Sequence, residues 1–486
     1  MITQQVINNH DDLLKAVDEM LNELGFSLKD FGGKLTFAGM DPIRPTVLKV
    51  GAASAIIAAA NAVASALIWQ ERCGETQDIH IDLRKAWTIQ SCWQVELYNC
   101  TTINGTSVMV SQNLTQAPAL YKTKDGRHVV VSTLYPRSFH VLLNVLDCGP
   151  NPEQMQKAIM KWNAKELEVA CQEAKTCLTM VRTQEEARKE EQYKYHAEAP
   201  LISIEKIGDS DPEPFEEAER PLSGIRALGM THVVSGPVVL RELAHHGADC
   251  LNLNTVDWLE LGLIYMNCDV GTRQTYLDAR FEQNRPKIYE LIKDADVFVE
   301  NLRPGQADKE GFSAEELAKH RPGIIYTSIK LCGETGPWAN HLGFDFNATA
   351  LTGILTEEGT PEVPLLTPAI NIVCDFVSGY LAIIGVKAAL LRRAKEGGSY
   401  KVHVNLAQTT MFMLSLGLID KKMLKDIESL GEEHQRLEPN LQSGMTPFGE
   451  YTRLGSQVEM SKTPEYWDDP MIWPIGSCKP EWLSKK

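Results

Sequence analysis

The chain has 486 residues, of which 43% are hydrophobic and 23% are charged. This composition is typical of a globular protein with roughly two to four domains and excludes a disordered chain. The formal net charge of −16 at pH 7 argues against nucleic acid or an anionic membrane as the main partner, although a local basic pocket can still bind an anion.

The sequence also carries signals about the cellular compartment. No stretch approaches the ~18–20 uninterrupted apolar residues of a membrane span, and the first residues lack the basic and apolar segments of a secretory signal. The 11 cysteines are scattered without a CxxC pair, which favours reduced thiols over a disulfide framework or a zinc site. These features predict a cytoplasmic protein without a metal site.

The N-terminal part contains two helical patterns and a strand. Residues 11–25 have apolar side chains at helical spacing, with Asp11 as the expected N-cap. Residues 52–70 are rich in alanine and apolar on every side, which predicts a buried helix that ends at Gly74. The alternation in 78–83 then predicts a strand.

The following part predicts a hairpin, a set of helices and a linker. Asp125-Gly126 lies between two short apolar runs, as in a β-hairpin. Residues 139–146 open a helix, and residues 153–196 are expected to be helical with charged, exposed faces. The acidic, proline-containing stretch 209–219 predicts a solvated linker between two units.

Beyond Pro221, strands and helices alternate. A helix is expected from Gly236-Pro237, and four apolar runs predict strands: 224–229, 248–253, 295–299 and 323–329. This alternation is typical of a doubly wound parallel α/β sheet. The GxGxxG fingerprint is absent from the first turn, which disfavours a nicotinamide enzyme.

An internal repeat carries the most information. Residues 52–86 align without gaps with residues 375–409, and each copy predicts a long buried helix, a turn with glycine and an alternating strand. The second copy begins with Asp375, whereas the first has Ala52 at the same position. The chain is therefore expected to hold one candidate site and not two.

Asp375 stands directly before an apolar helix, where two roles suit it. Its carboxylate is either an N-cap that accepts backbone N–H bonds or a group that the helix dipole keeps ionised and oriented for chemistry. Such a carboxylate can attack an activated acyl carbon and form a covalent intermediate. The residues alone leave both roles open.

The second half carries short motifs in a fixed order: 221–228 (PLSGIRAL), 231–237 (THVVSGP), 243–249 (LAHHGAD), 299–305 (VENLRPG), 325–329 (IYTSI), 333–337 (GETGP) and 343–345 (GFD). Together with Asp375, they resemble the family III CoA-transferases, or CaiB/BaiF family. This family includes formyl-CoA transferase, carnitine CoA-transferase and alpha-methylacyl-CoA racemase. The resemblance implies a Rossmann-like doubly wound large domain and a smaller α+β domain.

Residues 40–205 resemble later segments of the same family. The segment order therefore looks permuted, with one helix–strand unit duplicated. The domains expected on this basis are an N-terminal helix with a partial repeat of the large domain (1–110), a small domain (111–205), an acidic linker (206–220), the Rossmann-like CoA-transferase domain (221–420) and a C-terminal tail (421–486).

The resemblance implies a reaction and its partners. In the family's transferases, an aspartate at the position of Asp375 attacks an acyl-CoA thioester, forms a mixed anhydride, and then carries CoA as an aspartyl thioester to a carboxylic acid. The implied partners are an acyl-CoA and a carboxylic acid, with coenzyme A as a substrate and no further cofactor. The family's dimers make a homodimer the default, although the duplicated unit also allows a pseudo-dimeric monomer.

Two alternatives stay open. The family's racemases use the histidine of a Gly-His-Asp motif to move an α-proton, but this chain has Phe344 in that place, which favours transferase over racemase or epimerase chemistry. A non-catalytic CoA-binding paralogue is the other alternative. Its motivation is that the glycine-rich loop of some transferases is not recognisable and that the stretch 258–265 carries no cation.

The resemblance also implies roles for further residues. Asp345 and Phe344 are expected to support the site, although a structural hydrogen bond suits Asp345 equally well. Three of the residues expected at CoA also have a structural alternative: His232 as a packed histidine, Arg303 as a surface residue and Lys309 as a solvated lysine. Five residues are expected at CoA: His232, Val234, Asn301, Arg303 and Lys309.

Overall fold

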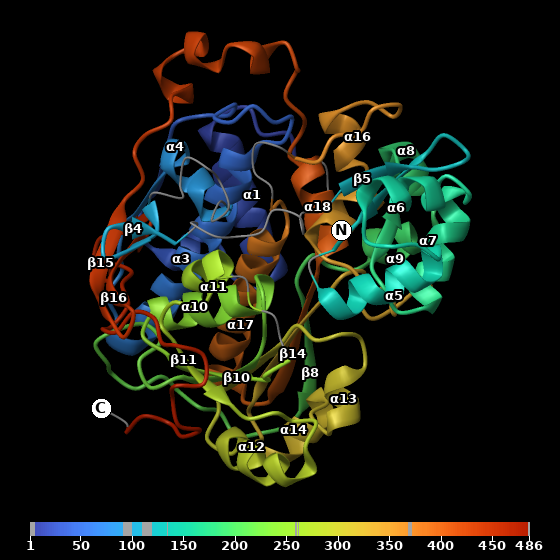
Figure 1. The fold of residues 1–486 in the computed structure, drawn as a ribbon. Coiled ribbons are helices and arrows are strands. Elements are labelled where there is room, and N and C mark those ends of the chain that lie inside the picture. The colour runs from blue at the N-terminus through green and yellow to red at the C-terminus, as the bar shows by residue number, and fades with distance from the viewer. Residues whose placement is uncertain are drawn as a thin grey trace.

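The computed structural model describes residues 5–90, 100–108, 119–133, 135–257, 260, 262–367 and 372–484. Figure 1 shows a sheet with helices on both faces, a group of N-terminal helices on one side of it, and a smaller unit in teal and green on the other. The mixed α/β architecture expected from the sequence is confirmed.

The central sheet has seven strands in the order β11-β10-β9-β12-β13-β14-β8. All neighbours are parallel except β8, which is antiparallel to β14. Every residue of β12 and β13 is buried, as expected for strands that helices cover on both faces. The strands are β8 (Ser203–Gly208), β9 (Arg226–Met230), β10 (Asp249–Asn254), β11 (Thr272–Tyr276), β12 (Val297–Glu300), β13 (Ile325–Lys330) and β14 (Ser399–Asn405).

The chain order of these strands is that of a doubly wound fold. It runs outward from β9 through β10 to β11 on one side and through β12 and β13 to β14 on the other, so the direction reverses between β9 and β12. Helices α10, α11 and α17 contribute to the main core on one face of the sheet. Helices α12, α13 and α14 contribute to a second core on the other face. Figure 1 shows the two groups of helices on opposite faces. The helices are α10 (Ser235–His245), α11 (Gly262–Cys268), α12 (Arg285–Ile292), α13 (Gln306–Glu310), α14 (Ala314–His320) and α17 (Asp375–Glu396), with a 3-10 turn at Glu282–Asn284.

The internal repeat is visible in the fold. Helix α3 (Val50–Cys73), strand β2 (Ile79–Asp82) and helix α4 (Leu83–Ala86) follow one another as α17, β14 and α18 (Leu406–Ser415) do. Helices α3 and α17 pack against each other in the main core. Strand β2 lies in a separate sheet of three strands, β1-β2-β17, and not in the central sheet. Its neighbours are β1 (Leu35–Ala38) and β17 (Val458–Met460).

The N-terminal helix is present, but its cap differs from the prediction. Helix α1 (His10–Glu23) begins after Asn9, whose extended backbone places its side-chain oxygen to accept the Asp12 N–H. Asp11 is therefore wrong as the cap and belongs to the first helical turn, where its negative charge favours the helix dipole. A short helix α2 (Leu28–Phe31) follows.

The smaller unit is built on the expected hairpin. Strands β5 (Ala119–Lys122) and β6 (His128–Val131) are antiparallel, and Gly126 supplies the positive φ of their turn. The prediction of continuous helix in 153–196 is wrong at β7 (Leu178–Met180), because these three buried residues pair with β6. The unit's helices are α5 (Pro136–Leu146), α6 (Pro152–Ile159), α7 (Ala164–Glu173), α8 (Gln184–Lys189) and α9 (Glu191–Glu198).

Two helices from the second half of the chain complete this smaller unit. Ala350 and Leu355 share a hydrophobic cluster with Val130 and Val181. They come from α15 (Asp345–Thr352) and α16 (Ile354–Glu358). The segment that precedes Asp375 is thereby anchored in the smaller unit, while α17 itself lies in the main core.

The predicted linker is largely without helix or strand, whereas the predicted tail contains strands. Residues 209–217 have no helix or strand and are mostly exposed, as the linker prediction requires, but residues 206–208 belong to β8. The tail, expected to be irregular, contains the strands β15 (Leu441–Thr446) and β16 (Gly449–Leu454), which extend a sheet with β3 (Thr102–Ile103) and β4 (Thr106–Ser107). Short 3-10 turns lie at Trp87–Gln90, Met423–Lys425, Ile427–Leu430 and Glu432–His434.

One helix is long and apolar enough to span a membrane by length and composition. It is α3, and the whole of its most apolar stretch is buried inside the protein. In this structure α3 serves as a core helix.

A buried lysine joins the two copies of the repeat. Lys387 of α17 is fully buried, and its Nζ donates to Asn61 Oδ1 at 2.5 Å and to Ser65 Oγ at 2.6 Å, both on α3. Burial lowers the pKa of Lys387 from 10.5 to about 7. The amine at the contact between the copies therefore gains or loses its proton near pH 7.

We predict that Lys387→Met changes how stability depends on pH. Above about pH 7 the unfolded chain binds more protons at this lysine than the folded protein does, so the wild type gains stability with rising pH, by up to about 1.4 kcal/mol per unit. Urea denaturation at about pH 7, 8 and 9 should show the wild type gaining relative to the variant. A constant difference between the two proteins would contradict the assignment.

Candidate functional site

A cavity of about 350 Å³ lies at the carboxyl ends of the central strands. Its walls include the loop after β9 (His232–Ser235) and the loop after β12 (Asn301–Pro304). These two strands are the pair at which the sheet order reverses, the position where open α/β sheets bind their ligands. The smaller unit closes the cavity with Tyr135, Ser138 and Cys177.

Asp375 enters this cavity from the first turn of α17. The turn is fixed by Asp345, whose Oδ2 accepts backbone N–H bonds from Val373 at 2.9 Å, Cys374 at 2.6 Å and Asp375 at 3.1 Å. Asp345 therefore provides the cap, which leaves the Asp375 side chain for the cavity. Within the described ranges, no hydrogen bond reaches the Asp375 carboxylate.

The two carboxyl groups have very different surroundings. Burial and the neighbouring charge of Asp345 raise the pKa of Asp375 well above its usual value. Burial also raises the pKa of Asp345, but its three backbone N–H bonds favour the ionised form. A proton shared by this pair therefore resides on Asp375, and the ionised Asp375 is a poorly solvated, reactive carboxylate.

The loop after β9 is held in a strained conformation. Val233 has φ of +68°, which is costly for a β-branched residue. The His232 N–H donates to Asn301 Oδ1 at 3.1 Å and the Asn301 amide donates to the His232 carbonyl at 2.9 Å. The Val233 N–H donates to Glu260 at 3.3 Å, and burial raises the pKa of Glu260 to about 7. The amide of Asn301 is thus engaged in holding this loop.

Aromatic side chains from both units meet at the cavity. The Tyr135 ring stacks on Phe344 with centroids 5.1 Å apart and lies edge-on to His232 at 5.9 Å. Burial and nearby Arg303 lower the pKa of His232 to about 4. The imidazole is therefore neutral near pH 7.

The cavity walls carry several cations. Arg303 is exposed in the loop after β12, and Arg280 lies beyond β11, where it pairs with Asp257 at 2.8 Å and with Asp278. Arg137 contributes from α5. A surface of this kind can receive phosphate groups.

Most of the residues expected at the site lie together. Asp375, His232, Val234, Asn301, Arg303 and Phe344 line the cavity, and Asp345 lies directly beneath the start of α17. Lys309, by contrast, is exposed on α13 and is not among the residues of the cavity wall.

Sequence reasoning missed several wall residues. The stretch in which the family resemblance led us to expect a cation is 258–265, of which 258, 259 and 261 lie outside the described residues. A cation of the cavity wall, Arg280, instead follows the next strand, β11. The position of Arg280 just after a buried strand was a signal that could have found it. Tyr135 and Arg137 gave no signal, because only folding brings α5 to this edge of the sheet.

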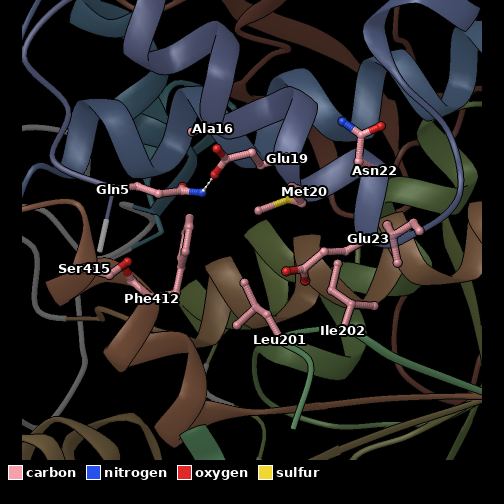
Figure 2. A pocket seen from close by; sticks show the side chains of 11 residues that line it. Gln5, Ala16, Glu19, Met20, Asn22, Glu23, Leu201, Ile202, Phe412 and Ser415 are labelled. Atoms are coloured by element: carbon pink, nitrogen blue, oxygen red, sulfur yellow. Dashed lines mark hydrogen bonds between the residues drawn. The ribbon is translucent and has the colours of Figure 1, made fainter. Parts of the chain in front are cut away.

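A second cavity, of about 430 Å³, lies between α1, α18 and residues 201–202 (Figure 2). Its apolar wall includes Leu201 and Phe412, and Glu19 on its rim accepts a hydrogen bond from Gln5. Among the described residues, its wall has none in common with the Asp375 cavity and carries no cationic side chain. The cavity at Asp375 is therefore the candidate active site.

The sequence profile of CoA-transferase family III matches residues 16–205 and 222–451. The chain belongs to CoA-transferase family III. The family and the fold expected from the sequence motifs are thereby confirmed. The two matched segments lie on either side of the acidic stretch 209–219, so the parts of the chain before and after it both match the family.

Curated proteins similar to this family member are named as transferases. Acetyl-coenzyme A transferase nodX of Hypoxylon pulicicidum is 28% identical over 334 residues, which cover 63% of this chain and 56% of that protein. Formyl-CoA:oxalate CoA-transferase of Streptomyces avermitilis is 31% identical and covers 42% of this chain and 52% of its own length. The chain thus spans little more than half the length of these relatives.

Solved structures give similar matches. A CaiB/BaiF family protein from Brucella suis is 25% identical with a TM-score of 0.37, covering 48% of this chain and 65% of that one. A hypothetical protein from Mycobacterium tuberculosis is 26% identical with a TM-score of 0.37, covering 40% and 57%.

We predict that Asp345→Asn lowers the pKa of Asp375. The amide oxygen of asparagine can still accept the three backbone N–H bonds, but the negative charge that opposes ionisation of Asp375 is gone. Carboxyl ¹³C NMR of aspartate-labelled protein, with Asp375 assigned through Asp375→Asn, should show the Asp375 resonance titrating at lower pH in the variant. An unchanged titration would mean that burial alone sets the pKa.

Proposed function

We propose that this protein transfers CoA from an acyl-CoA to a carboxylic acid, with Asp375 as the covalent nucleophile. The observation that carries the proposal is the unpaired Asp375 carboxyl group, with its raised pKa, at the cavity where the sheet order reverses. Burial weakens solvation of the ionised form and so increases its reactivity toward a thioester.

The reaction would proceed through three covalent species on Asp375: an anhydride with the donor acid, a thioester with CoA, and an anhydride with the acceptor acid. An Asp375 oxygen attacks the thioester carbonyl, the C–O bond forms, and the C–S bond breaks to give an acyl-aspartyl anhydride and CoA thiolate. The thiolate then attacks the aspartyl carbonyl and releases the first carboxylic acid. The acceptor carboxylate then attacks this aspartyl-CoA thioester, the C–S bond breaks, and a second mixed anhydride forms between Asp375 and the acceptor. CoA thiolate attacks the acceptor's acyl carbon in this anhydride, which yields the new acyl-CoA and releases the Asp375 carboxylate.

The cavity suits these partners. Arg303 and Arg280 offer guanidinium groups to the phosphates of CoA. The similar proteins are named for acetyl-CoA, formyl-CoA and oxalate, which makes short acyl groups and small carboxylic acids the first substrates to examine. The proposal needs CoA only as a substrate. A homodimer and a cytoplasmic location stay predictions.

Racemisation is the second candidate function, because His232 and Asp375 line the same cavity. Phe344 cannot transfer a proton, so the histidine used by the family's racemases is missing from its place. Another group would have to carry the α-proton. This difference favours CoA transfer.

We predict that Asp375→Asn abolishes CoA transfer. Loss of the nucleophile should lower turnover on the order of 10³-fold or more, because the amide cannot form the anhydride. The wild type, incubated in deuterated water with short acyl-CoA donors and free acids, should form new acyl-CoA without α-deuterium. Mass spectrometry should find CoA attached to the peptide that contains Asp375.

Glu19→Gln is the matched control, since Glu19 lines only the second cavity (Figure 2) and should leave transfer unchanged. α-Deuteration without new thioesters would replace the transferase with a racemase. CoA binding without either product, across a broad panel of donors and acids, would establish the non-catalytic paralogue.

We predict that Arg303→Gln weakens CoA binding. Removing an exposed guanidinium from the cavity wall should raise the KM for the acyl-CoA about tenfold and leave that for the acid unchanged. Lys319→Gln removes an exposed charge on α14, and Lys319 is not among the residues of the cavity wall. Equal effects of both substitutions would show that net charge matters and the Arg303 contact does not.

A further inference from the structure

The smaller unit contributes a phenol to the centre of the cavity. Tyr135 lies at the start of α5, its ring is stacked on Phe344, and its hydroxyl oxygen lies 3.4 Å from His232 Nδ1. Asp375 lines the same cavity. Burial, followed by the charges of Glu260 and Asp375, raises the pKa of Tyr135. Tyr135 therefore joins the smaller unit to the loop after β9 beside the nucleophile.

The direction of the hydrogen bond follows from the surroundings. Burial keeps Tyr135 protonated, because its pKa is raised well above the usual value. The same burial, with Arg303 nearby, keeps His232 neutral. A buried phenol proton requires an acceptor, and within the described part of the chain His232 Nδ1 is the acceptor that the Tyr135 hydroxyl reaches.

We propose that Tyr135 is a positioning residue, which donates to His232 Nδ1 and thereby fixes the tautomer that carries its proton on Nε2. A neutral imidazole with one nitrogen occupied as an acceptor presents the other as a donor. The Asn301 clamp on the His232 backbone fixes the residue, and Tyr135 fixes the ring.

This inference rests on the proposed transfer reaction and adds a role for His232. When an Asp375 oxygen bonds to the thioester carbon, the carbonyl π electrons move to the oxygen and create an oxyanion. The Nε2–H of His232 donates a hydrogen bond to that oxyanion and keeps its proton. Collapse of the oxyanion then expels CoA thiolate. Donors fixed in advance in this way lower the barrier because they need no reorganisation.

The tautomer can be tested without turnover. In ¹⁵N-histidine-labelled protein, with His232 assigned through His232→Asn, the wild type should show an unprotonated Nδ1 and a protonated Nε2. Tyr135→Phe keeps the ring that stacks on Phe344 and removes the hydroxyl, so His232 should shift to a mixture of tautomers. A protonated Nδ1 in the wild type, or no change in the variant, would overturn the inference. The wild-type spectrum alone decides if the variant does not fold.

Kinetics test the consequence. Tyr135→Phe should lower kcat about tenfold with little change in the KM for acyl-CoA, and Tyr135→Phe combined with His232→Ala should be no slower than His232→Ala alone. Additive losses would show that Tyr135 acts independently of His232. Tyr289→Phe, which removes a half-buried hydroxyl bonded to the Gly311 carbonyl, is the control. A tautomer shift in a protein without transfer activity would overturn the proposed function and leave the role of Tyr135 standing.

Discussion

The geometry of the site depends on one buried carboxylate. Asp345 accepts the backbone N–H groups of Val373, Cys374 and Asp375, which a helix cannot satisfy internally. Because Asp345 begins α15, and Ala350 of that helix packs in the smaller unit, this cap ties the start of α17 to that unit. The same charge opposes ionisation of Asp375. A single group therefore both places Asp375 and opposes the ionisation of its carboxyl group.

The first copy of the repeat has the same kind of helix cap but lacks a counterpart of Asp375. Asp41 accepts N–H bonds from Gly51 at 3.0 Å and Ala52 at 2.7 Å at the start of α3, as Asp345 does at the start of α17. Ala52 occupies the position of Asp375, so that helix start is capped but has no side-chain carboxyl group. The helices of the two copies, α3 and α17, pack against each other. This packing places Lys387 in the core, where it donates a hydrogen bond to Asn61 of α3. The two copies thus share a structural role and differ in the carboxyl group at the helix start, which only the second copy has.

The cavity exists only where two units meet. The large sheet supplies the loops after β9 and β12, including the clamped and strained loop at Val233, and the smaller unit supplies Tyr135. Strain at Val233 persists because Asn301 and Glu260 hold the neighbouring backbone groups. Closure by the second unit reduces the access of water, which the proposed anhydride requires.

Hydrophobic periodicity and short motifs are local signals, so they predicted the alternation of strands and helices, the repeat, and the place of Asp375 before a buried helix. Helix α1 also followed from its pattern, although its cap is Asn9 and not Asp11. Strand β7 and the cavity cation Arg280 could not be read locally, since each depends on a partner that folding supplies. The cap that Asp345 provides for α17 and the hydrogen bond between Tyr135 and His232 could be found only in the folded protein. Hydrogen bonds between distant segments produce no periodic pattern in the sequence.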